Sequence, residues 1–167
     1  MFKPASLALL AFVSLPLLAA ESAEVPTTQQ VMKDHKAAIQ NQIADIDYKR
    51  KQILAAGMQL DGPEGERFWP IYNSYRTEAD KLSQAAIALV LDYARAYNTA
   101  SVDDATAAKL QEKLLDLQED RLELKEKYAE RIAKEVSPKR SLRFLQIEDQ
   151  LDAISLLANT RDIPLVE

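Results

Sequence analysis

The sequence predicts an all-α protein, an elongated four-helix antiparallel bundle or hairpin of long helices. Glycine is nearly absent, and all three glycines fall within residues 57–65, so glycine marks only one break between elements. No segment alternates apolar and polar residues as a strand does, whereas apolar residues recur at helical spacing over long stretches. Long helices joined by short connections pack as bundles or hairpins.

The first helix is expected over residues 28–56. Gly57 follows it, and a glycine at this place can adopt the left-handed conformation that ends a helix. The apolar residues that define this helix and the turn after it fall at intervals of seven: Met32, Ile39, Ile46, Ile53 and Leu60.

The second helix is expected to begin after Asp61, whose carboxylate can cap the free N–H groups, with Pro63 in the first turn. Pro70 lies inside this helix and predicts a kink, because proline removes a backbone donor. Residues 85–94 are apolar on nearly every side, so more than one neighbour should cover them. The apolar seam of this helix follows the four-three spacing of a coiled coil: Phe68, Tyr72, Tyr75, Ala79, Leu82, Ala86, Leu89, Tyr93 and Ala96.

The third helix is expected to start at Ser101, which forms a capping-box pattern with Asp104, and to run to about residue 136. A fourth helix follows the pair Ser137 and Pro138, and the segment around Pro164 should be extended. At ~1.5 Å per residue the second and third helices are each ~50 Å long, so the molecule is elongated. The third helix carries two adjacent apolar stripes: Leu110, Leu114, Leu117, Leu124 and Tyr128, and Leu115, Leu122, Ala129 and Val136.

Aromatic residues gather around Pro70, where Phe68, Trp69, Tyr72 and Tyr75 lie close together in the sequence. They form either a hydrophobic anchor for the start of the second helix or an exposed binding platform. Phe68, Tyr72 and Tyr75 share the period of the core seam, which favours the anchor. Trp69 points to the side and is a candidate partner contact.

The first residues are typical of a secretory signal peptide. Lys3 precedes an apolar run at 5–20, which is shorter than the ~20 residues of a membrane-spanning helix. We expect a signal peptide at 1–20, cleavage before Glu21 or Glu24, and a single all-α periplasmic domain at 21–167 without stable membrane insertion. An uncleaved N-terminal anchor is the alternative. The chain has no cysteine, which excludes disulfides and thiolate chemistry.

The composition also argues against catalysis and nucleic-acid binding. The formal net charge is -5, which is unfavourable for contact with phosphates. His35 is the only histidine and lies among charged residues, so no nucleophile–base pair is indicated. Met32 shares its helix face, but two groups do not complete a metal site. The acidic residues of 112–135 alternate with Lys and Arg, as on a solvated helix face. We therefore predict a protein that is no enzyme and has no cofactor or metal.

Two segments, "LDGPEGERFWPIYNSY" and "VSPKRSLRFLQIEDQLDAI", resemble the repeated segments of Spy/CpxP-like periplasmic proteins. In that family each segment has a Leu-Thr-x-x-Gln core that opens a helix. The matching positions are 60–64 and 136–140, which keep the hydrophobic and capping residues and lack the glutamine in both copies. The similarity in layout covers most of the chain after the signal peptide.

The resemblance implies a thin, curved, antiparallel helical dimer in the cell envelope, without a catalytic centre. Relatives act as ATP-independent chaperones for unfolded proteins or as modulators of stress sensors, some of which respond to metals. The best-studied relatives use a basic concave face, whereas this chain is acidic overall.

We therefore expect a chaperone-like holdase related to envelope stress, which forms a homodimer and binds unfolded or folded envelope proteins. The alternative is a regulatory adaptor that docks on an envelope stress or metal sensor. The candidate contact residues are Trp69, Lys49, Arg50, Lys139, Arg140 and Arg143. The candidate structural residues are Leu60, Asp61, Phe68, Pro70, Tyr72, Tyr75, Ser137 and Pro138.

Overall fold

The computed structural model describes residues 25–160 and 163–166, and the predicted signal peptide lies outside these residues. Within them the chain forms helices and no strand, which confirms the all-α prediction. The described helices are α1 (Thr28–Asp34), α2 (Lys36–Met58), α3 (Gly62–Asn98), α4 (Asp104–Glu135) and α5 (Pro138–Thr160).

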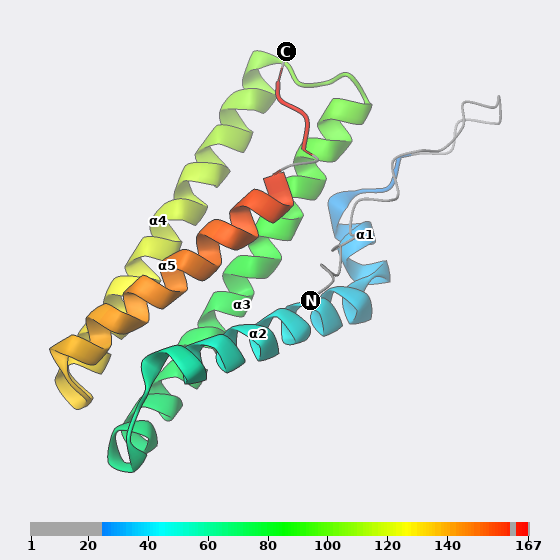
Figure 1. The fold of residues 1–167 in the computed structure, drawn as a ribbon. Helices are drawn as coiled ribbons and strands as arrows, with labels where there is room; N and C mark the ends of the chain where they lie inside the picture. Colours follow the sequence, from blue (N-terminus) through cyan, green and yellow to red (C-terminus); the bar gives the residue numbers. More distant parts are fainter. Residues whose placement is uncertain (1–24, 161–162, 167) are drawn as a thin grey trace.

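The long helices α3 and α4 form an antiparallel hairpin (Figure 1). α5 turns back from the end of α4 and packs along the hairpin, and α2 packs against α5 and α3. The turns from α2 to α3 and from α4 to α5 therefore lie at the same end of the molecule (Figure 1). We call this the core end, and we call the end with the α3–α4 turn the far end.

The predicted first helix is divided in two at His35, whose φ of -103° and ψ of 13° leave helical geometry. Thr27 caps α1 by accepting a hydrogen bond from the backbone N–H of Gln30 at 3.2 Å. The division lets α1 turn away from the line of α2 and pack against α3 (Figure 1).

The prediction that Gly57 ends the helix was wrong. Gln59 is the left-handed residue, with φ of 50°, and Gly57 lies two residues earlier, inside α2. A Cβ atom at Gly57 would come within 2.7 Å of Ile147 Cδ1, so a larger residue here would displace the end of the Ile147 side chain. The carbonyls at the end of α2 accept from side chains instead: Arg143 donates to Gly57 O, and Arg140 donates to the carbonyls of Met58 and Gln59.

The predicted start of α3 agrees with the structure. Asp61 Oδ1 accepts the N–H of Glu64 at 2.8 Å, and the Glu64 carboxylate accepts the N–H of Asp61 at 3.4 Å, which completes a capping box. α3 then continues through Pro70, and the Ser74 hydroxyl donates to the Pro70 carbonyl at 3.0 Å.

The start of α4 differs from the prediction, because Asp103 rather than Ser101 caps it. Asp103 Oδ1 accepts the N–H of Thr106 at 2.8 Å. Ser101 belongs to the preceding turn and lies 2.8 Å from the Thr99 hydroxyl. At α5 the predicted cap is present, since Ser137 Oγ accepts the N–H of Arg140 at 3.2 Å.

The core lies at the core end, between α2, α3, α4 and α5. Phe68, Tyr72 and Tyr75 are all buried, as the predicted anchor requires. The ring of Phe144 from α5 meets Tyr75 edge-on with centroids 5.2 Å apart. The largest fully buried side chains are Tyr72, Phe68, Phe144, Leu54, Met58, Ile71, Ile132 and Glu148. Among the described helices, none has the length and apolar character needed to cross a membrane.

Candidate functional site

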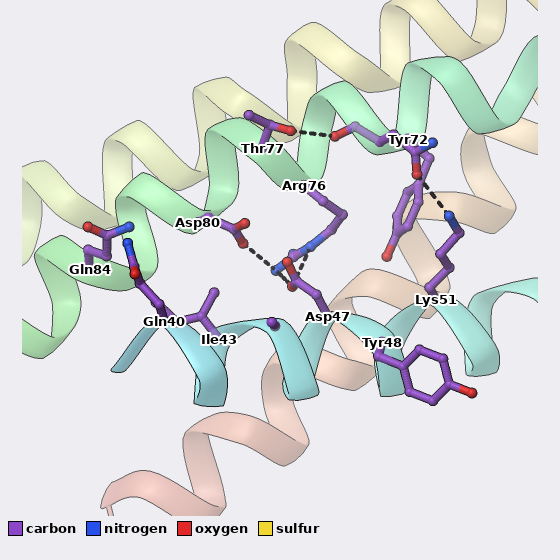
Figure 2. A pocket seen from close by; sticks show the side chains of 12 residues that line it. Gln40, Ile43, Asp47, Tyr48, Lys51, Tyr72, Arg76, Thr77, Asp80 and Gln84 are labelled. Atoms are coloured by element: carbon purple, nitrogen blue, oxygen red, sulfur yellow. Dashed lines mark hydrogen bonds and ion pairs between the residues drawn. The ribbon is translucent and has the colours of Figure 1, made fainter. Parts of the chain in front are cut away.

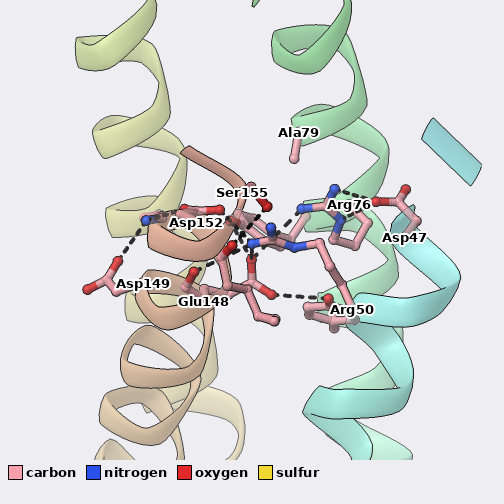
Figure 3. A network of polar contacts seen from close by, with 12 residues as sticks. Asp47, Arg50, Arg76, Ala79, Glu148, Asp149, Asp152 and Ser155 are labelled. Atoms are coloured by element: carbon pink, nitrogen blue, oxygen red, sulfur yellow. Dashed lines mark hydrogen bonds and ion pairs between the residues drawn. The ribbon is translucent and has the colours of Figure 1, made fainter. Parts of the chain in front are cut away.

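A carboxylate lies in the middle of this apolar core. The side chain of Glu148 on α5 is fully buried, and α2 and α3 supply its hydrogen-bond donors. Arg50 Nη2 donates to Oε2 at 2.6 Å, the Tyr72 hydroxyl donates to Oε1 at 3.1 Å, and the Tyr75 hydroxyl donates to Oε2 at 3.3 Å. We call these four residues the buried polar centre, of which Figure 3 labels Arg50 and Glu148.

Further ion pairs surround the centre. Arg50 also donates to Asp152 Oδ1 at 2.6 Å, and Lys125 on α4 pairs with Asp152 at 2.6 Å and with Asp149 at 2.7 Å. On the other side Arg76 lies 3.8 Å from Glu148 (Figure 3). The centre and its surroundings therefore connect side chains from α2, α3, α4 and α5.

The protonation states suit these contacts. Burial, together with the negative charge of Glu148, raises the pKa of Tyr72 and of Tyr75, so both hydroxyls keep the protons that they donate. Burial alone would lower the pKa of Arg50, but Glu148 and Asp152 outweigh it and the pKa is raised. A buried carboxylate with charged and neutral donors around it is stabilised by them. With no exposed surface, Glu148 cannot touch a substrate in this conformation, so its role here is to hold α5 against α2 and α3.

A polar groove lies between α2 and α3, with a cavity of about 650 Å³ (Figure 2). Arg76 on its wall binds Asp47 of α2 and lies 3.6 Å from Asp80. Burial and the neighbouring Asp47 raise the pKa of Asp80 to about 7, although Arg76 opposes this. The lining residues are Gln40, Ile43, Ala44, Asp47, Tyr48, Lys51, Tyr72, Asn73, Arg76, Thr77, Asp80 and Gln84. No set of three or more acidic, histidine or cysteine side chains in the described part of the chain could hold a metal ion.

The structure places the basic candidate contacts in different surroundings. Arg50 is buried in the polar centre. Arg140 pairs with Glu64 at 2.5 Å, and both it and Arg143 donate to carbonyls at the end of α2. Lys49 and Lys139 are exposed, and Lys49 pairs with Asp45 at 2.6 Å. These five residues thus do not form one free basic surface, because all three arginines are bound to acceptors within the chain. Trp69 is half-buried under the ammonium group of Lys51, which lies 5.5 Å from the ring centroid.

Among the described helices, α4 and α5 carry most of the exposed large apolar side chains. The first predicted stripe of α4 packs inward at Leu117, Leu124 and Tyr128, whereas Leu115 and Leu122 of the second stripe are more than half exposed. On α4 the exposed residues Leu114, Leu115 and Leu122 form what we call the α4 row. On α5 the exposed apolar residues, the α5 row, are Leu142, Ile154, Leu156 and Leu157.

Sequence reasoning missed Glu148, although a signal for it was available. Glu148 follows Phe144 by four positions and precedes Leu151 by three, and both of those residues are buried. An acid at helical spacing between two core residues indicates a buried carboxylate that needs a partner. The identity of that partner depends on how α2 docks, which is not encoded in the local pattern.

Comparisons with known protein families, with curated proteins and with solved structures find no match for this chain.

Proposed function

We propose that the protein is a periplasmic, envelope-stress-related chaperone that holds unfolded proteins without ATP. The observation that supports this most directly is the pair of exposed apolar rows on α4 and α5. Apolar burial is non-directional, so such rows can bind many sequences that expose apolar groups. Scattered exposed leucines are ordinary, but Leu114, Leu115 and Leu122 lie within about two turns of one helix.

The buried polar centre supports the proposal in a second way. A surface that binds unfolded chains must stay open without drawing the protein's own helices out of place. The aromatic core and the contacts of Glu148 fix α2, α3 and α5 through groups that the rows do not use. The rows can therefore remain exposed while the fold stays intact.

A homodimer is part of the proposal. Two copies related by a two-fold axis would each contribute the same surface to the interface. Sedimentation equilibrium of residues 21–167 measures this directly, with a dimer mass expected.

The experiment for the chaperone activity is light scattering of a chemically denatured client diluted into buffer with residues 21–167 and no ATP. We expect slower aggregation at near-stoichiometric ratios. Replacing Leu115 and Leu122 by serine should remove most of the effect, whereas serine at Gln111 and Gln118, which are exposed and polar on the same helix, should not. Equal circular dichroism spectra of both variants would show that folding is unchanged.

Two outcomes contradict the proposal. If the wild-type protein leaves aggregation unchanged across a wide range of ratios, the holdase function is wrong. If it instead binds one folded envelope domain saturably, the protein is a regulatory adaptor that docks on a sensor.

A further inference from the structure

Residues 163–166 lie beside the far end of the α3–α4 hairpin (Figure 1). They form neither helix nor strand, and the hydroxyl of Tyr93 on α3 donates to the carbonyl of Pro164 at 2.9 Å. Ile163 is half-buried, whereas Leu165 and Val166 are 87% and 59% exposed. We call residues 163–166 the C-terminal segment.

The helix beneath this segment is strongly apolar and only thinly covered. α4 packs along one side of α3, and α1 packs against another. The fully buried side chains all belong to the core end, and the far half of α3 has none of them. Ala96 is buried there, and Ala85 and Tyr97 are exposed. The other apolar side chains of this half are half-buried: Ala86, Ile87, Ala88, Leu89, Val90, Leu91, Tyr93 and Ala94. The far half of α3 therefore has apolar surface that a further chain segment can cover.

The contact that the segment makes does not depend on a particular sequence. Its polar part is a main-chain carbonyl that accepts from a tyrosine hydroxyl, and every residue of an unfolded chain has such a carbonyl. The segment also carries a half-buried aliphatic side chain, Ile163, on a non-helical backbone, and Pro164 prevents the segment from continuing α5 as a helix. An unfolded client presents the same groups.

We propose that the far half of α3 is a second client-binding surface and that the C-terminal segment occupies it as a tethered competitor. The inference rests on the proposed chaperone function for the identity of the competing ligand, an unfolded polypeptide. Because the segment belongs to the same chain as the surface, its effective concentration there is on the order of 1 mM. Clients therefore bind only if they outcompete the segment. Their apparent affinity is the affinity for the uncovered surface multiplied by the fraction of time that the surface is uncovered.

The first test is binding of the segment to the truncated protein. A fluorescent peptide with the sequence of residues 161–167 is titrated with protein that ends at Thr160, and fluorescence anisotropy is recorded. We expect saturable binding to the truncated protein and at least tenfold weaker binding to the chain that ends at 167. Tyr93→Phe in the truncated protein should weaken the binding about threefold or more, whereas Tyr97→Phe, one turn further along α3, should not.

Substitutions in the untruncated chain give a test that does not depend on the truncation. Ile163→Ser should loosen the segment and increase the affinity for reduced, carboxymethylated α-lactalbumin, a permanently unfolded probe, at least threefold. Leu165→Ser, at an exposed position of the same segment, is the matched control and should leave the affinity unchanged. Circular dichroism of each variant verifies that the helices persist.

The outcomes separate this inference from the proposed function. If the peptide binds the truncated protein no better than the untruncated one, or if Ile163→Ser and Leu165→Ser behave alike, the competitor inference is overturned. If the peptide binds only the truncated protein but neither form slows client aggregation, the competing contact stands and the chaperone function fails.

Discussion

Replacing Glu148 by alanine tests the role of the buried polar centre. The change removes the carboxylate that accepts from Arg50 at 2.6 Å and from the hydroxyls of Tyr72 and Tyr75. Arg50 keeps Asp152, whose side chain is 44% exposed, so its charge is left with one partner instead of two.

The expected loss of stability follows from the burial of these groups. Breaking a buried ion pair by removing one partner costs about 3–5 kcal/mol, and the remaining contact of Arg50 with Asp152 places the effect near about 3 kcal/mol. For a chain of this size, about 1 kcal/mol shifts Tm by about 2–4 °C, so Tm should fall by about 6–12 °C.

The assay is urea unfolding followed by far-UV circular dichroism. Asp149→Asn is the matched control on α5, because Asp149 is 66% exposed and its pair with Lys125 should contribute less than about 1 kcal/mol. The double variant Arg50→Met/Glu148→Leu should recover part of the loss, because it leaves no unpaired charge. A loss below about 1 kcal/mol for Glu148→Ala, or a double variant less stable than the single one, would refute the reasoning.

Three further predictions concern export, the aromatic core and pH. Protein recovered from the periplasm should have an intact mass that begins at Glu21 or Glu24, and a full-length cytoplasmic species would contradict export. Tyr72→Ala should lower the free energy of unfolding by about 3–5 kcal/mol in thermal unfolding, whereas Tyr48→Ala, at a side chain that is 64% exposed, should change it little. The pKa of Asp80 is raised in the folded state from 3.8 to about 7, so between these pH values the folded protein binds more protons than the unfolded chain. Its stability should therefore fall as pH rises from about 4 to about 7. Asp80→Asn should make Tm less dependent on pH over this range, and an unchanged dependence would show that Asp80 does not titrate there.

The helix starts that the sequence predicted well are those with local causes. At Asp61 and Ser137, the capping side chain and the following proline lie within a few residues of the N–H groups that they serve. The burial of Phe68 and Tyr72 was predictable for a similar reason, since helical spacing alone places both on the face that meets α5.

The features that the sequence did not reveal depend on contacts between distant segments. Gly57 resembled a helix terminator, but it lies inside α2, where the side chain of Ile147 on α5 approaches it closely. At the start of α4, Ser101 and Asp103 are both good caps, and the course of the preceding turn decides between them. Arg50 was expected at a partner surface because its sequence neighbours are basic. Its acceptor lies on α5, far along the chain, so the local sequence does not indicate the bond.

The bond between Arg50 and Glu148 also bears on the order of events during folding. The two residues are separated by 98 positions, whereas the turn between α3 and α4 brings their neighbouring ends together over a few residues. Closing a long loop costs more chain entropy than closing a short one, so contacts of this kind form late. A newly made chain would therefore pair α3 with α4 early and would complete the docking of α2 only after α5 has been synthesised. Until then Arg50 would remain in water without Glu148, which keeps the early chain loosely packed.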